Sequence, residues 1–292
     1  MEKLTRVFAA ALACLLAQQF TFADEGSAAR PAFFAFCMDT YDSQKRSLEQ
    51  QAALLEELGY DGAGHLWLDN LEERIKTLDA HGLRLFQVYL QVNIAADANS
   101  PYDPRLKESL PLLRGRKTML ALLMSGAAPS DPALDERAVA LVQEIADMAN
   151  EAGVRVALYP HSGNWLEHVE DGLRIVQKAK RPNVGVMFNL CHWLKVDDEK
   201  NLKPLLTSAM PHLFAVSIHG ADRAEAIHAG TGNWIQPLGN GSFDVGALLD
   251  TLRELGYQGP VGLQCYGIPG DARDHLTKSM TDWRRLMDAR RP

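Results

Sequence analysis

Apolar segments alternate with amphipathic segments from residue 31 onward, at intervals of roughly thirty residues. The apolar segments are hydrophobic on both faces, as the strands of a buried parallel sheet are. Strands are predicted at 33–38, 61–66, 83–92, 118–124, 154–161, 184–192, 213–219 and 261–266. The main predicted helices between them are 43–58, 70–80, 135–152, 165–179, 200–209, 243–255 and 271–289. Ser43 is the predicted N-cap of the first helix, and Gly59 its end.

Eight strand–helix units predict an α/β fold that is a single (β/α)8 TIM barrel over residues 31–292. An open doubly wound sheet is the rival interpretation, but such sheets normally use about five or six strands. No glycine fingerprint for a dinucleotide or a P-loop follows the first predicted strand.

Polar side chains are concentrated at the carboxyl ends of the predicted strands, which meet at one mouth of a TIM barrel. Four of them are candidate catalytic residues: Tyr159, His161, His192 and His219. Five more residues are candidates for substrate binding: His65, Asn189, Gln264, Trp193 and Trp234. Each has a structural alternative, because a strand-end histidine can bond a neighbouring loop and a tryptophan can pack on the rim.

The positions of the histidines separate them into two groups. His192 and His219 are expected at strand ends, where neither requires deep burial. His81, His168, His212 and His275 fall in predicted helices or turns and are expected at the surface.

The composition narrows the class of partner. The chain has 37 acidic and 30 basic residues and a net charge of −7, which argues against nucleic acid. The tryptophans expected at the barrel mouth favour a small carbohydrate as the partner. Besides Cys14 the chain has Cys37, Cys191 and Cys265, with no CxxC spacing for zinc. Cys37 and Cys265 would lie on neighbouring strands if the barrel closes, so they are either a disulfide pair or buried free thiols.

The first 23 residues have the layout of a secretory signal peptide. Lys3 and Arg6 precede an apolar run that ends in small residues at Ala23, and the run is too short to span a bilayer. Cleavage after Ala23 predicts a periplasmic or secreted protein. A weaker lipoprotein-like box ends at Cys14, so lipid anchoring there is the alternative.

The segment QPLGNGSFDVGALLDTLRELGYQGPVGLQCYG, residues 236–267, resembles the C-terminal signature of the xylose-isomerase-like sugar isomerase and epimerase superfamily. The segment ELGYDGAGHLW, residues 57–67, is also similar. The resemblance implies a divalent metal held by carboxylates on strands five, six and eight and by a histidine on strand seven. It also implies proton transfer by two glutamates. The superfamily includes endonucleases that act at abasic DNA, but the acidic charge makes that branch a poor fit.

Three of the implied ligands are replaced in this chain. By position, the strand-five Glu falls on Tyr159, the strand-six Asp on Asn189 and the strand-eight Glu on Gln264. His219 and His192 match the family's histidines. Neutral groups are weak ligands for Mg²⁺ or Mn²⁺, whereas His161, His192 and His219 could act as metal ligands for a softer ion such as Zn²⁺. The predicted cofactor is therefore one divalent metal ion, Zn or Mn, or else the site is metal-free.

Three functions remain open at this point. The first is an isomerase, epimerase or lyase that transfers a proton next to a sugar carbonyl. The second is a carbohydrate-binding barrel without catalysis, and the third is a metal-dependent hydrolase that uses the histidine cluster. The retained histidines favour the first, and the lost carboxylates favour the second.

Overall fold

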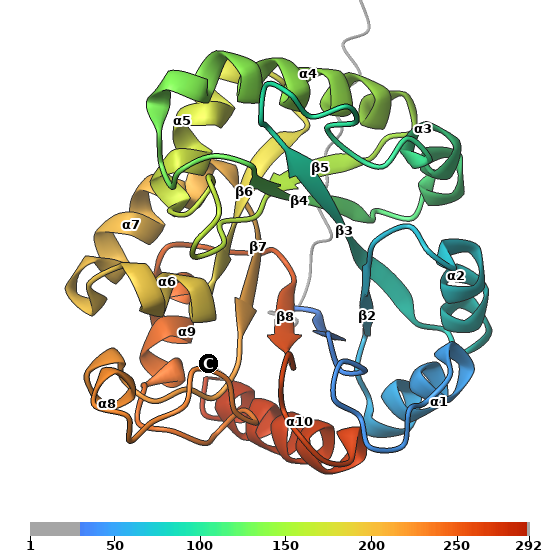
Figure 1. The fold of residues 1–292 in the computed structure, drawn as a ribbon. Helices are drawn as coiled ribbons and strands as arrows, with labels where there is room; N and C mark the ends of the chain where they lie inside the picture. Colours follow the sequence, from blue (N-terminus) through green and yellow to red (C-terminus); the bar gives the residue numbers. More distant parts are fainter. Residues whose placement is uncertain (1–29, 291–292) are drawn as a thin grey trace, which may run out of the picture. The chain divides into compact units, whose positions relative to one another are not determined.

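Eight parallel strands close into a barrel in the order in which they occur along the chain (Figure 1). The structure is a computed structural model that describes residues 30–290, so the predicted signal peptide and Cys14 lie outside the described residues. The strands are β1 (Phe33–Phe36), β2 (Gly62–Leu66), β3 (Arg84–Asn93), β4 (Met119–Ser125), β5 (Arg155–Leu158), β6 (Val184–Asn189), β7 (Leu213–Ile218) and β8 (Val261–Gln264). The predicted TIM barrel is confirmed.

Helices surround the strands, as Figure 1 shows. They are α1 (Leu48–Leu58), α2 (Leu71–Ala80), α3 (Leu106–Ser109), α4 (Asp135–Glu151), α5 (Val169–Ala179), α6 (Leu190–Val196), α7 (Leu202–Ala209), α8 (Ala224–His228), α9 (Val245–Glu254) and α10 (Ala272–Asp288). Short 3-10 turns occupy Leu110–Leu113 (η1), Pro132–Leu134 (η2), Glu199–Asn201 (η3) and Met210–His212 (η4). None of the helices described within residues 30–290 is long and apolar enough to cross a membrane.

The barrel interior and the layer beneath the helices form two separate hydrophobic clusters. The interior cluster consists of aromatic, methionine and alanine side chains: Phe34, Phe36, Phe86, Tyr89, Met119, Ala121, Tyr159, Met187 and Ala215. The larger cluster lies between the strands and the helices. Because the interior is filled with side chains, the chemistry is confined to the mouth.

Barrel closure joins the two ends of the described chain. β1 pairs with β8 over four residues, from Phe33 opposite Val261 to Phe36 opposite Gln264. The Phe33 ring also stacks on Trp283 of α10, with ring centroids 4.1 Å apart. Cys37 and Cys265 follow this pairing directly, as the sequence predicts, and both thiols are free.

The first helix begins later than the sequence pattern predicts. Its N-cap is Ser47 and not Ser43, because the Ser47 hydroxyl accepts from the Gln50 N–H while the Gln50 side chain accepts from the Ser47 N–H. Gly59 is confirmed as the end of the helix and has a left-handed φ of 81°.

The sixth strand ends earlier than predicted. It stops at Asn189, whose side chain accepts from the His192 N–H and so caps α6. Cys191 and His192 therefore lie on the first turn of a helix and not on a strand. The fifth strand likewise stops at Leu158, so Tyr159 and His161 follow it in the loop.

Candidate active site

Three neutral side chains meet at the carboxyl ends of β5, β6 and β8. The Asn189 Nδ2 atom donates to the Tyr159 hydroxyl at 2.6 Å and to the Gln264 Oε1 atom at 2.9 Å. All three residues are buried, with Asn189 only 1% exposed. The positions that the resemblance aligns with metal-binding carboxylates thus form one hydrogen-bonded unit, which we call the amide–phenol set.

Two histidine rings are in contact beside this set. The ring centroids of His161 and His192 are 3.8 Å apart, and the ring planes are tilted by 36°. The His161 Nδ1 atom donates to the Ser162 carbonyl at 3.0 Å, and the Ser162 hydroxyl lies 3.3 Å from His192 Nδ1. With the Nδ1 hydrogen of His161 engaged, its Nε2 atom carries the lone pair of the neutral ring.

Burial and neighbouring positive charge keep this pair neutral. Burial is the largest influence on the pKa of His192 and, together with His161, Lys195 and His219, lowers it to about 2. Burial and Lys195 also lower the pKa of His161. Both rings are therefore unprotonated at neutral pH and can accept a proton or a hydrogen bond.

Lys195 is a site residue that the sequence analysis missed. It lies three residues after His192 on α6, so the two side chains share a helix face. Its Nζ atom is 5.6 Å from the ring centroid of Trp234, and its charge lowers the pKa of His161, His192 and His219. The sequence carried a signal for Lys195, namely the His-x-x-Lys spacing, which places both side chains on one face of a helix that follows a strand end.

His219 is more deeply buried than the sequence suggests. It is 0% exposed, and burial lowers its pKa to about 4. Its Nδ1 atom donates to the Gly220 carbonyl at 2.9 Å, while its buried Nε2 atom has no partner within the described chain. His192 is buried as well, so the expectation that neither residue is deeply buried is wrong.

His65 has both ring nitrogens engaged by the protein. Its Nε2 atom donates to the Asp69 carbonyl at 2.7 Å, and its Nδ1 atom accepts from Arg74 Nε at 3.4 Å. Burial lowers the pKa of His65, which is consistent with a neutral ring in which Nε2 carries the hydrogen and Nδ1 accepts. The structure therefore places His65 near the carboxyl end of β2, with no ring nitrogen free for a substrate.

The two candidate tryptophans differ in accessibility. Trp193 is 3% exposed and its ring contacts Phe188 and Phe243, so its burial favours the alternative of packing on the rim. Trp234 is half-buried beside Lys195 and retains an accessible position near the mouth. His275 corrects another expectation, since it is buried in α10 and not at the surface.

The donor atoms at the mouth do not fit a hard divalent cation. The aligned positions supply amides and a phenol that hydrogen-bond to one another, and the Lys195 ammonium is close by. Within residues 30–290 the potential ligand atoms of one group lie within 4.8 Å of one another, namely those of His168, Glu170 and Asp197. His161, His192 and His219 do not form such a group.

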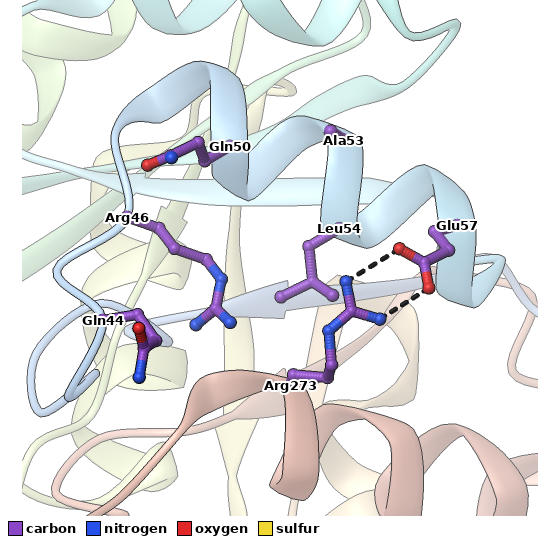
Figure 2. Close-up of a pocket in the computed structure, with 7 residues that line it drawn as sticks. All are labelled: Gln44, Arg46, Gln50, Ala53, Leu54, Glu57 and Arg273. Carbon is purple, nitrogen blue, oxygen red and sulfur yellow. Dashed lines mark hydrogen bonds and ion pairs between the residues drawn. The ribbon is translucent and has the colours of Figure 1, made fainter.

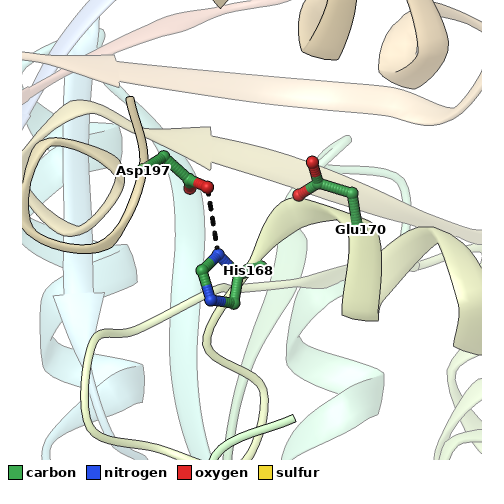
Figure 3. Close-up of side chains that lie close together, drawn as sticks. All are labelled: His168, Glu170 and Asp197. Carbon is green, nitrogen blue, oxygen red and sulfur yellow. Dashed lines mark hydrogen bonds and ion pairs between the residues drawn. The ribbon is translucent and has the colours of Figure 1, made fainter. Parts of the chain in front are cut away.

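The group of His168, Glu170 and Asp197 lies at the start of α5 and the end of α6 (Figure 3). The His168 Nδ1 atom is 3.1 Å from the Asp197 carboxylate, which is an ion pair when the ring is protonated. Burial raises the pKa of both Glu170 and Asp197.

A separate cavity of about 340 Å³ lies between α1 and α10 (Figure 2). Arg273 in this cavity pairs with Glu57, and Arg46 pairs with Asp42 and Asp271. Because its charged side chains pair with one another, the cavity has no free charged group for a ligand.

Comparison with known proteins agrees with the architecture. Residues 52–286 match the family described as xylose isomerase-like TIM barrel. A ketose 3-epimerase of Arthrobacter globiformis is 25% identical over 150 residues, which cover 50% of this chain and 47% of that protein. The chain thus spans about half the length of this curated relative.

Solved structures share the fold at low sequence identity. The D-allulose 3-epimerase of Methylomonas sp. in complex with D-allulose has a TM-score of 0.68 at 18% identity, covering 88% of this chain and 97% of that one. A xylose isomerase-like TIM barrel protein from Mycobacterium smegmatis in complex with magnesium has a TM-score of 0.65 at 16% identity, covering 91% and 99%.

Proposed function

Because the chain belongs to the xylose isomerase-like TIM barrel family, we propose that it is a carbohydrate enzyme that transfers a proton next to a sugar carbonyl. Its reaction is isomerisation, epimerisation or elimination on a sugar or keto-sugar. The contacting neutral pair of His161 and His192, beside the amide–phenol set, is the observation that carries this proposal.

His161 is the proposed base. Its Nε2 lone pair is free because the Nδ1 hydrogen is donated to Ser162, and its ring is less buried than that of His192. Abstraction of the proton from the carbon next to the carbonyl moves the electron pair onto the carbonyl oxygen. We assign stabilisation of that negative charge to the Lys195 ammonium and the Tyr159 hydroxyl, and hydrogen bonding of a sugar hydroxyl to His192.

The fate of the proton decides the reaction class. Return of the proton to the opposite face of the same carbon gives an epimer, and delivery to the neighbouring carbon gives an isomer. Departure of a substituent from the next carbon gives elimination. The Gln264 amide nitrogen is available to orient a substrate hydroxyl, because the bond from Asn189 uses only the Gln264 oxygen.

Solvent exchange tests this proposal. In D₂O the protein should place deuterium on the carbon next to the carbonyl of a keto-sugar. His161→Gln should lower the exchange rate by about 10²–10⁴, the usual worth of a general base. His212→Gln, a histidine of the η4 turn outside the site, is the matched control and should leave the rate unchanged.

A non-catalytic carbohydrate-binding barrel is the second candidate. The observation that favours it is the replacement of three carboxylates by side chains that bond to one another. Binding of keto-sugars without any exchange would support this candidate and rule out the enzyme. The metal-dependent hydrolase has no comparable support, because the three mouth histidines are not grouped as metal ligands.

We also propose that the protein is exported to the periplasm or secreted. The support is the sequence of residues 1–23 alone. N-terminal sequencing of the mature protein should begin at Asp24. An abundant species that retains Met1 would contradict export, and a lipid on Cys14 would indicate a membrane-anchored form.

A further inference from the structure

A second cavity lies beside the barrel mouth, between the loops that follow β2 and β3. Its volume is about 760 Å³, within the range of small-molecule sites. We call it the rim pocket. Among its lining residues are Trp67, Asp69, Gln91, Asn93, Tyr102 and Ser125.

Trp67 connects the rim pocket to the mouth. It lines the pocket and also packs against the interior cluster that contains Tyr89 and Tyr159, and its backbone N–H donates to the Tyr89 backbone carbonyl at 3.1 Å. Its φ of 66° is in the left-handed region, which a bulky side chain rarely adopts. The surrounding structure therefore holds this ring in place against a local backbone cost.

The pocket offers neutral hydrogen-bonding groups that the protein does not use. The side chains of Gln91 and Ser125 have no hydrogen bond to any residue within 30–290. Asn93 accepts from the Ala95 N–H through Oδ1, which leaves its amide nitrogen free. Tyr102 is fixed by its hydroxyl, which donates to Glu144.

One arginine and two aspartates line the pocket, which is a net charge of −1, and the arginine is already paired. Arg105 donates to Asp69 at 2.9 Å and also to Asp103, so its guanidinium is paired with two carboxylates. Among residues 30–290 no other lysine or arginine lines the pocket. A phosphate or carboxylate ligand would therefore find no free cation here, whereas an uncharged ligand would find an aromatic wall and free amides.

We propose that the rim pocket binds an uncharged second sugar ring, so that the substrate is a glycoside or disaccharide whose reacting ring occupies the mouth. Aromatic side chains with neutral amides and hydroxyls match the apolar faces and hydroxyl edges of a sugar. The inference rests on the proposed function, because it assigns the reacting ring to the histidine site.

Calorimetric titration of the mature protein tests this inference. The probes are D-glucose, D-glucose 6-phosphate, maltose, cellobiose and trehalose. At least one disaccharide should bind roughly tenfold or more tightly than glucose, since a stacked ring and two or more added hydrogen bonds are gained. Glucose 6-phosphate should bind no better than glucose.

Substitutions in the rim pocket test whether the added affinity for a disaccharide comes from this pocket. Trp67→Gly removes the ring and suits the local backbone, and Gln91→Leu removes the amide at an exposed position. Each should abolish most of the disaccharide advantage while glucose affinity stays within about twofold. Leu112→Ala, an exposed residue of η1 outside the pocket, is the control. If Trp67→Gly melts early, Gln91→Leu carries the test alone.

Two outcomes overturn the inference. One is that no disaccharide binds more tightly than glucose, and the other is that the variants weaken glucose and disaccharide equally. Failure of the proposed function has a different signature. Deuterium exchange into a keto-sugar without a disaccharide advantage refutes the rim pocket alone, whereas a disaccharide advantage without exchange refutes the enzymatic proposal alone.

Discussion

Restoring carboxylates at the mouth should convert a neutral site into a metal-dependent one. In the double variant Asn189→Asp with Gln264→Glu, the hydrogen bonds from Asn189 Nδ2 to Tyr159 and Gln264 are lost. Both positions are buried, at 1% and 5% exposed, so bulk water does not reach a charge at either one. Without metal, two carboxylates would share a site that water does not solvate.

The cost of this change follows from the burial. A buried charge without a partner costs about 3–5 kcal/mol, and each lost hydrogen bond about 0.5–1.5 kcal/mol. Together these costs are about 4–8 kcal/mol. For a domain of this size about 1 kcal/mol corresponds to about 2–4 °C, so Tm should fall by about 8–32 °C in EDTA. Mn²⁺ at about 100 times its Kd should return about 2.7 kcal/mol of stability.

Thermal denaturation followed by circular dichroism, in EDTA and in MnCl₂, measures both effects. Wild type should show no Mn²⁺-dependent rise in Tm. Asn183→Asp is the matched control, because Asn183 Nδ2, like Asn189 Nδ2, donates to two oxygen atoms but lies outside the mouth; its acceptors are the carbonyls of Ala146 and Val154. Equal Mn²⁺ shifts in wild type and the double variant would refute the reasoning, as would a double variant that is fully stable in EDTA.

Two further predictions concern the histidines. Lys195→Gln removes a positive charge that disfavours protonation, so the pKa of His161 should rise in an NMR titration, and an unchanged or lower pKa would contradict the placement of Lys195. The pKa of His219 in the folded protein is about 4, below its unfolded value of about 6.5, so the unfolded state binds more protons between these values. The free energy of unfolding should therefore decrease as pH falls from about 6.5 to 4. Measured by urea denaturation at several pH values, this decrease should be less steep in His219→Gln than in wild type, by about 1.4 kcal/mol per pH unit.

The barrel was predictable because its signal is local and repeated. Apolar runs on both faces, followed by helices with a defined end such as Gly59, predict the strand and helix order that the structure shows. The gathering of Tyr159, Asn189 and Gln264 was predictable for a related reason, since parallel strands end at one mouth.

The end of β6 was mispredicted because the hydrophobic pattern of the sequence does not change where the strand gives way to α6. The residues after Asn189 are as apolar as those before it, so hydrophobicity alone does not distinguish the end of β6 from the start of α6. The cap made by the Asn189 side chain determines that boundary.

Burial of His219 depends on a distant segment. The loop after β7 folds back so that Gly220 and Gln236 pair as an isolated antiparallel bridge, and this covers the strand end. Because this pairing depends on residues distant in the sequence, the residues around His219 do not predict its burial. The burial of Trp193 has a comparable cause, since its ring packs on Phe243, fifty positions away.

The pairing of β1 with β8 has a consequence for how the chain acquires its fold during synthesis. Until residues 261–264 emerge, β1 and β7 both remain open edges, and Phe33 lacks the Trp283 ring that covers it. The Tyr60 hydroxyl likewise cannot make its hydrogen bond until the Leu276 carbonyl, 216 positions later, has been synthesised. Closure therefore depends on contacts between the first and last parts of the domain, which form late and slowly. A nascent chain arrested before β8 would be an unclosed sheet, accessible to proteases and chaperones, and deletion of the last helix should be as damaging as deletion of the first strand.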